Sequence, residues 1–230
     1  MSRRTLDFVF AGGGAILGIL LLVLGFVLAG QASFATNYVA DQLGQQKITF
    51  TAADKLTAEE KNWKPGSVCL TDYAGQLMTT GKMAECYANF YIALHLETAS
   101  TTAGYPGETY ATLGSIQSTL RTQVAKAKAT NDTAAATAAQ AKLDAVTSLR
   151  STAQTGETLR GLLLTSYGFS VFGDKADLAG NVCFAIGSIL LVLAIAGAIH
   201  AVLTPADKLV AVPAGYKMVP TDKGPAARGT

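Results

Sequence analysis

The chain contains an uncharged stretch at residues 178–203 that constrains its fold more than any other feature. The stretch reads LAGNVCFAIGSILLVLAIAGAIHAVL, which is 26 residues without an Asp, Glu, Lys or Arg. As an α-helix it would be about 39 Å long, and the hydrocarbon core of a bilayer is about 30 Å thick. Because soluble core helices rarely stay uncharged on every face over such a length, the stretch predicts a transmembrane helix.

A second apolar stretch, FVFAGGGAILGILLLVLGFVLAG, occupies residues 8–30. It is longer than the roughly 7–15 residues that form the apolar core of a signal peptide. Small residues at positions 29–35 resemble a signal-peptidase site, so a cleaved leader is the alternative. Together the two stretches predict an all-α membrane protein in which transmembrane helices at residues 8–30 and 178–203 flank a helical domain at residues 31–177.

The charges divide unevenly along the chain. Residues 1–7 carry a net charge of +1, the tail at residues 204–230 carries +2, and residues 31–177 carry −1. Basic residues gather on the cytoplasmic side of membrane helices. We therefore predict a cytoplasmic N-terminus, a disordered cytoplasmic tail and an extracytoplasmic domain in the cell membrane. The small overall charge of +2, without a basic stripe, makes the lipid bilayer the expected partner and argues against nucleic acid.

The pattern within the predicted domain is helical. A capping box at Thr57 and Glu60 opens a short helix, and the Ala- and Thr-rich residues 110–151 predict a helical hairpin that turns at residues 130–132 and acts as a docking arm. Apolar residues three and four positions apart indicate that residues 32–43 continue the first span as a helix. They indicate further helices at residues 70–96, where a division into two helices at Gly81 is the alternative, and at residues 157–172. The last of these is predicted to end at Gly173, separately from the second transmembrane helix.

Two cysteines, Cys69 and Cys86, lie in the predicted extracytoplasmic domain. Outside the cytoplasm, thiols at this separation are expected to oxidise to a disulfide, which would stabilise the fold by about 3 kcal/mol in the loop-entropy model. Two buried free thiols are the alternative. Neither the cysteine spacing nor nearby histidines favour a zinc site.

The chain offers few residues for catalysis. Its two histidines, His95 and His200, lie on opposite sides of the predicted membrane, whereas a mononuclear iron site needs two histidines and a carboxylate together. The carboxylates show no pairing typical of a general acid and base, and the glycines show no phosphate-binding pattern. We therefore predict no enzyme activity, no catalytic residues, no metal and no cofactor. His95 is the candidate for ligand binding or pH sensing, and a plain structural histidine is the alternative.

Small residues four positions apart occur in both apolar stretches. Gly14 and Gly18 form one such pair, and Ala194 and Ala198 form another. Pairs of this kind let helix backbones approach closely in lipid, so these four residues are predicted to pack against another helix. Leucine at both glycines is expected to weaken that association. Because the stretches lack Asp, Glu, Lys and Arg, an oligomeric channel is a less favoured prediction.

Three segments resemble a family of actinobacterial two-span membrane proteins of undefined function. Residues 38–49 resemble that family's ADQ-x-I-x element, and residues 95–97 with 107–113 are similar to its H-x-LEATGGKTYAEL run. Residues 159–166 resemble its LR-x-SLFTS run before the second span. The resemblance implies the two-span plan. Many such proteins carry the label "aromatic ring-opening dioxygenase", which conflicts with the scarcity of histidines in this chain.

The sequence as a whole predicts a structural or accessory membrane protein, a subunit or scaffold of a larger membrane assembly. Its expected partners are other membrane protein subunits or further copies of itself. The alternative is an extracytoplasmic ligand sensor that relays to a partner protein.

The disulfide gives a direct chemical test. We expect Cys69 and Cys86 to resist alkylation in the intact protein and to become reactive only after reduction, which mass spectrometry of the modified peptides would measure. Alkylation of both thiols without a reductant would contradict the pairing.

Overall fold

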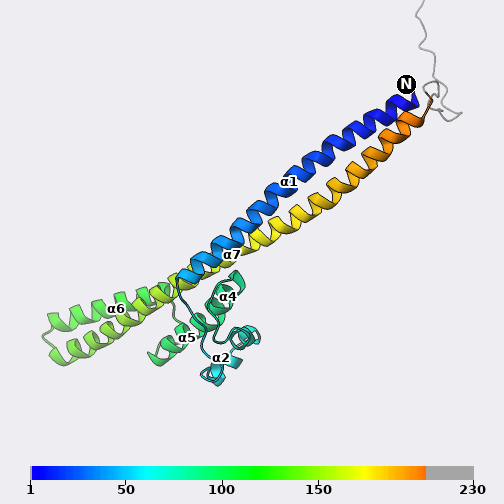
Figure 1. The fold of residues 1–230 in the computed structure, drawn as a ribbon. Helices are drawn as coiled ribbons and strands as arrows, with labels where there is room; N and C mark the ends of the chain where they lie inside the picture. The colour runs from blue at the N-terminus through cyan, green and yellow to red at the C-terminus, as the bar shows by residue number, and fades with distance from the viewer. Residues whose placement is uncertain (1, 206–230) are drawn as a thin grey trace, which may run out of the picture. The chain divides into compact units, whose positions relative to one another are not determined.

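The computed structural model describes residues 2–205, which form helices joined by loops and an isolated antiparallel bridge between Thr49 and Leu77 (Figure 1). The predicted tail at residues 206–230 lies outside the described residues. The elements in chain order are α1 (Arg3–Gln45), α2 (Ala58–Asn62), the 3₁₀-helix η1 (Pro65–Ser67), α3 (Val68–Asp72), α4 (Gly81–Cys86), the π-helix η2 (Tyr87–Ile92), α5 (Ala93–Thr102), α6 (Tyr110–Ala129) and α7 (Thr133–Leu203).

The chain divides into two compact units. The terminal unit comprises Met1–Phe26 and Asn181–Thr230, and the central unit comprises Val27–Gly180. Within the described residues, α1 and α7 are the two helices that are long and apolar enough to cross a membrane. Large apolar side chains of the terminal unit point outward from both helices, among them Phe10 at 71% exposure and Val192 at 65%.

The two helices of the terminal unit run antiparallel and touch through glycine. A Cβ atom on Gly18 would lie 3.0 Å from the carbonyl oxygen of Gly187, and one on Gly187 would lie 2.9 Å from the carbonyl oxygen of Gly18. Gly14 faces Ala194, with 3.8 Å between a Cβ built on Gly14 and the Ala194 Cβ. Gly14 and Gly18 therefore contact α7 of their own chain, and a larger side chain at Gly18 would force the backbones apart.

The contact follows a seven-residue spacing. Positions 11, 18 and 25 of α1 are buried, as are positions 187, 194 and 201 of α7, and all six are Gly or Ala. A buried residue at every seventh position is the pattern by which helices of a coiled coil keep one face against their partner. In the central unit the spacing recurs, with Ala32 and Val39 buried on α1 and Gly173 and Gly180 on α7.

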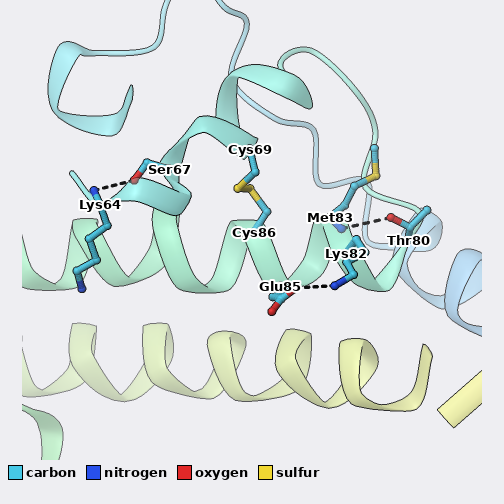
Figure 2. Close-up of a disulfide and its surroundings, with 8 residues drawn as sticks. All are labelled: Lys64, Ser67, Cys69, Thr80, Lys82, Met83, Glu85 and Cys86. Carbon is cyan, nitrogen blue, oxygen red and sulfur yellow. Dashed lines mark hydrogen bonds and ion pairs between the residues drawn. A yellow bond between two sulfur atoms is a disulfide. The ribbon is translucent and has the colours of Figure 1, made fainter. Parts of the chain in front are cut away.

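The core of the central unit forms around a disulfide. The bond joins Cys69 in α3 to Cys86 at the end of α4, with 6.1 Å between their Cα atoms (Figure 2), as predicted. Around it pack buried side chains from α1, the loops and the short helices, including Val39, Phe50, Leu70 and Met78. The bond thus links two short helices that both contribute buried side chains to this core.

A second cluster holds the helical hairpin together. Leu113 and Leu120 of α6 pack against Val146 and Leu149 of α7. A buried polar side chain, Gln117, lies among them, and its amide nitrogen donates to the Thr147 hydroxyl at 2.8 Å. The hairpin turns between Ala129 and Thr133, where the sequence placed it.

One helix boundary differs from the prediction, and another follows the predicted alternative. The expected end at Gly173 is wrong, because α7 continues without interruption from Thr133 to Leu203. A helical glycine costs about 1 kcal/mol relative to alanine, but here a Cβ would lie 2.9 Å from the Ala35 Cβ, so the glycine permits close packing instead of ending the helix. The run at residues 70–96 is divided, as the alternative predicted: Leu77 lies in the bridge, and α4 begins at Gly81, where the Thr80 hydroxyl caps it.

The glycine contact predicts a strong effect of side-chain size. Gly18→Leu should lower the free energy of unfolding by about 3 kcal/mol, because the new side chain overpacks a backbone contact. Gly13→Leu is the matched control, since a Cβ at Gly13 meets nothing within 4 Å, and it should not destabilise the protein. Denaturant unfolding of the full chain in detergent measures both variants. Equal effects of the two would contradict the contact.

Candidate functional site

A pocket of about 510 Å³ opens on the central unit between the π-helix η2, α5 and one part of α7. This volume lies within the range of about 300–1,000 Å³ that is typical of small-molecule sites. Aromatic and apolar side chains form one wall, and residues of α7 with small hydroxyl side chains form much of the other. The residues that line the pocket are Tyr87, Tyr91, Ile92, His95, Leu96, Ser151, Thr152, Thr155, Gly156 and Leu159.

The aromatic wall is a stack of three rings on consecutive turns. The rings of Tyr87 and Tyr91 stack with 4.6 Å between centroids, and the ring of His95 meets Tyr91 edge-on at 4.3 Å. Phe50 of the core supports the stack with an edge contact to Tyr87. The first two of the three rings lie in the π-helix, a form that is rare and frequent at functional sites.

His95 pairs with a carboxylate on a different helix. Its Nε2 lies 3.2 Å from Oε1 of Glu60, whose side chain is only 7% exposed, whereas the His95 side chain is 52% exposed. The N–H of Thr57 donates to the other oxygen of Glu60 at 2.7 Å, and the N–H of Glu60 donates to the Thr57 hydroxyl at 3.1 Å. The predicted capping box at Thr57 and Glu60 is therefore confirmed, and it orients the carboxylate toward His95.

These contacts decide the protonation of Glu60. Burial alone would raise the pKa of Glu60, but hydrogen bonds with Thr57 and His95 and the nearby imidazole outweigh it and lower that pKa below its usual 4.5. Glu60 is therefore ionised at neutral pH and can only accept. It follows that His95 donates through Nε2, and in the neutral ring Nδ1 keeps a free lone pair.

Tyr87 is held in its protonated form. Burial, together with the negative potential of Tyr91 and Glu60 and a hydrogen bond with Tyr91, raises the pKa of the Tyr87 phenol to about 12. Such a phenol can donate or accept a hydrogen bond at neutral pH, but it is a poor base or nucleophile. Tyr87 is therefore suited to hydrogen bonding rather than to proton abstraction.

The opposite wall offers hydroxyl oxygens. Thr152 donates to the carbonyl oxygen of Ser148 at 3.2 Å, and Thr155 donates to that of Ser151 at 3.1 Å, so both hydroxyls turn only acceptor lone pairs outward. Gly156 lets α7 approach α5, because a Cβ there would lie 2.6 Å from a methyl carbon of Leu96.

The other predicted residues lie elsewhere. His200 belongs to the terminal unit, where its Nε2 is 3.8 Å from Oδ2 of Asp7, whereas His95 belongs to the central unit. Ala198 is half-buried and lines a groove beside the glycine contact of the terminal unit. Within residues 2–205 no group of three or more His, Cys, Asp or Glu side chains is placed to hold a metal ion.

Sequence reasoning missed Tyr87, Tyr91 and Gly187. The two tyrosines lie within the predicted run at residues 70–96, and their spacing with His95, four residues at each step, marks the three as neighbours on a helix. Gly187 would have been found by searching for small residues at seven-residue spacing. No family model, no curated protein and no solved structure matches this chain.

The Glu60 carboxylate predicts a pH-dependent stability. Because folding lowers the pKa of Glu60, the ionised group stabilises the fold above pH 4.5, and this stabilisation is lost as the pH falls through the folded-state value. Glu60→Gln should cost about 1–2 kcal/mol at neutral pH, because the uncharged amide oxygen accepts weaker hydrogen bonds than the carboxylate does. Water around the half-exposed His95 limits the loss.

Chemical unfolding over a pH series tests this effect. The difference in free energy of unfolding between wild type and Glu60→Gln should shrink below pH 4.5. Glu59 is an exposed neighbour, so the control variant Glu59→Gln should match wild type at every pH. Parallel curves for wild type and Glu60→Gln at every pH would show that the carboxylate charge is not stabilising.

Proposed function

We propose that the chain is an integral protein of the cell membrane with two spans, cytoplasmic termini and the central unit outside. The outward apolar side chains of α1 and α7 in the terminal unit support the spans, because lipid would cover them. The disulfide supports an oxidising location for the central unit. The basic residues near both ends of the sequence support cytoplasmic termini.

Within that membrane arrangement we propose an accessory role, in which the chain binds another membrane protein through its helices. The observation that carries this proposal is an apolar groove of about 310 Å³ in the terminal unit. Its lining combines small residues, among them Gly12, Ala15 and Ala198, with larger ones such as Phe8 and Ile195. Small residues on a groove floor let a further apolar helix approach closely, which is how helices associate in lipid.

A second candidate function is the sensing of a small ligand outside the cell, and the pocket at Tyr91 and His95 favours it. A sensor of this kind would relay to a partner protein. Membership of the actinobacterial two-span family remains a proposal that rests on the resembling segments, and the dioxygenase label attached to that family is not part of it.

Native mass spectrometry of protein extracted gently from its own membranes tests the accessory role. We expect a stoichiometric foreign subunit to remain bound. Gly12→Leu should release it by filling the groove, since a Cβ at Gly12 meets nothing within 4 Å and the helix pair itself is undisturbed. Gly13→Leu, at a neighbour that does not line the groove, should leave the complex intact.

Other masses would point to other functions. A complex made only of copies of this chain would contradict the foreign partner and favour a scaffold or channel, to be followed by conductance measurements. A monomer with a bound small molecule would contradict the accessory role and favour the sensor.

A further inference from the structure

The pocket of the central unit has an unusual balance of hydrogen-bonding groups. The hydroxyls of Thr152 and Thr155 already donate to their own helix, and Nε2 of His95 donates to Glu60. The two threonine oxygens therefore present acceptors on the pocket wall, and Nδ1 of His95 is a third acceptor whenever the imidazole is neutral. A ligand with N–H or O–H donors can pair with these acceptors, while the hydroxyls of Ser151, Tyr87 and Tyr91 can either donate or accept.

The charge around the pocket has one sign. Among the described residues that line it, no side chain is Lys or Arg. The ionised carboxylate of Glu60 lies directly behind His95, and its field reaches Tyr87 as well. The faces of aromatic rings are themselves electron-rich and attract cations. An anionic ligand would therefore be repelled, and a cation would be attracted.

The remaining lining is apolar. Ile92 and Leu96 stand on the side of the stacked rings, and Leu159 stands on α7. A small inorganic cation would leave this surface uncovered, and it would also lack the carboxylate ligands that such ions require. The surface instead suits a hydrocarbon or aromatic body attached to the charged group.

We infer that the pocket binds an organic ammonium ion, with its N–H groups toward the acceptors of Thr152, Thr155 and His95 and its apolar body against Ile92, Leu96 and Leu159. The Glu60 carboxylate supplies the charge complementarity through His95. This inference rests on the second of the two proposed functions, ligand sensing. Its failure would leave the accessory role untouched, because that role concerns the terminal unit and is measured by complex mass.

Three ligands of similar size separate charge from shape. They are phenethylamine as the cation, 2-phenylethanol as the neutral match and 3-phenylpropanoate as the anion. Each would be titrated by ligand-observed NMR against the full chain in nanodiscs, with empty nanodiscs as the control for partition into lipid. Phenethylamine should bind at least about tenfold more tightly than the alcohol, and the anion more weakly than either.

Variants assign the binding to this pocket. Ser151→Phe should abolish binding by filling the pocket from its exposed α7 wall, whereas Ser148→Phe, exposed one turn earlier and outside the lining, should leave it unchanged. Glu60→Gln should reduce the affinity for phenethylamine toward that for 2-phenylethanol and leave the alcohol unaffected. Because Ser151 is exposed, a folding defect is not expected, and retained resistance of Cys69 and Cys86 to alkylation would verify the fold.

The contrary results are equally defined. Absence of phenethylamine binding to the folded wild type would overturn the inference, as would equal affinity for the amine and the carboxylate. Binding that survives Ser151→Phe would place the amine elsewhere on the protein. Binding of the alcohol as tight as that of the amine would retain a pocket but remove the charge preference, and with it the ammonium assignment.

Discussion

The contact between the backbones of Gly18 and Gly187 sets the geometry of the terminal unit. Helices normally keep their axes about 8–10 Å apart because side chains lie between them, and only residues without a Cβ allow a closer approach. Here each glycine lies within about 3 Å of where the other would carry its Cβ. Side chains of α1 and α7 outside that contact can be large and apolar, and many of them are exposed leucines, isoleucines and phenylalanines.

The central unit uses a different means of stabilisation. Its helices α2 to α4 are only five or six residues long, too short to be stable alone. A disulfide, two side-chain caps and one buried cluster hold them, and the π-helix begins at the residue directly after Cys86. The stacked wall of the pocket is therefore anchored by a covalent bond at Cys86, the residue directly before its first ring. Pocket and disulfide are parts of one local structure.

Local signals in the sequence predicted part of this fold. The two apolar helices follow from composition, the Thr57 cap follows from a four-residue pattern, and the hairpin turn at residues 130–132 follows from polar residues between two helical stripes. Other features depend on packing across the fold. Gly173 resembles a helix end in sequence, and only the approach of Ala35 explains why α7 passes through it.

The candidate site likewise combines features that the local sequence indicates with features that only tertiary packing creates. His95 could be singled out because the chain has two histidines, but its partner Glu60 is 35 residues away in sequence and is brought near only by tertiary packing. The switch from α-helix to π-helix at Tyr87 has no local sequence signal that we recognise. The seven-residue spacing of glycine and alanine is visible in the sequence, yet the two pairs four apart include only one member of each repeat, Gly18 and Ala194.

That spacing also restricts how the terminal unit can move. If α1 slid along α7 by one helical turn, Gly18 would leave Gly187 and face Phe184 or Leu191. The large side chain would then have to fit between two backbones whose spacing leaves room only for glycine. Register can be restored only after a whole seven-residue repeat, a displacement of about 10 Å. Sliding by one helical turn is thus blocked. Tilting or rotation of the two helices together, in contrast, keeps the glycine contact in place.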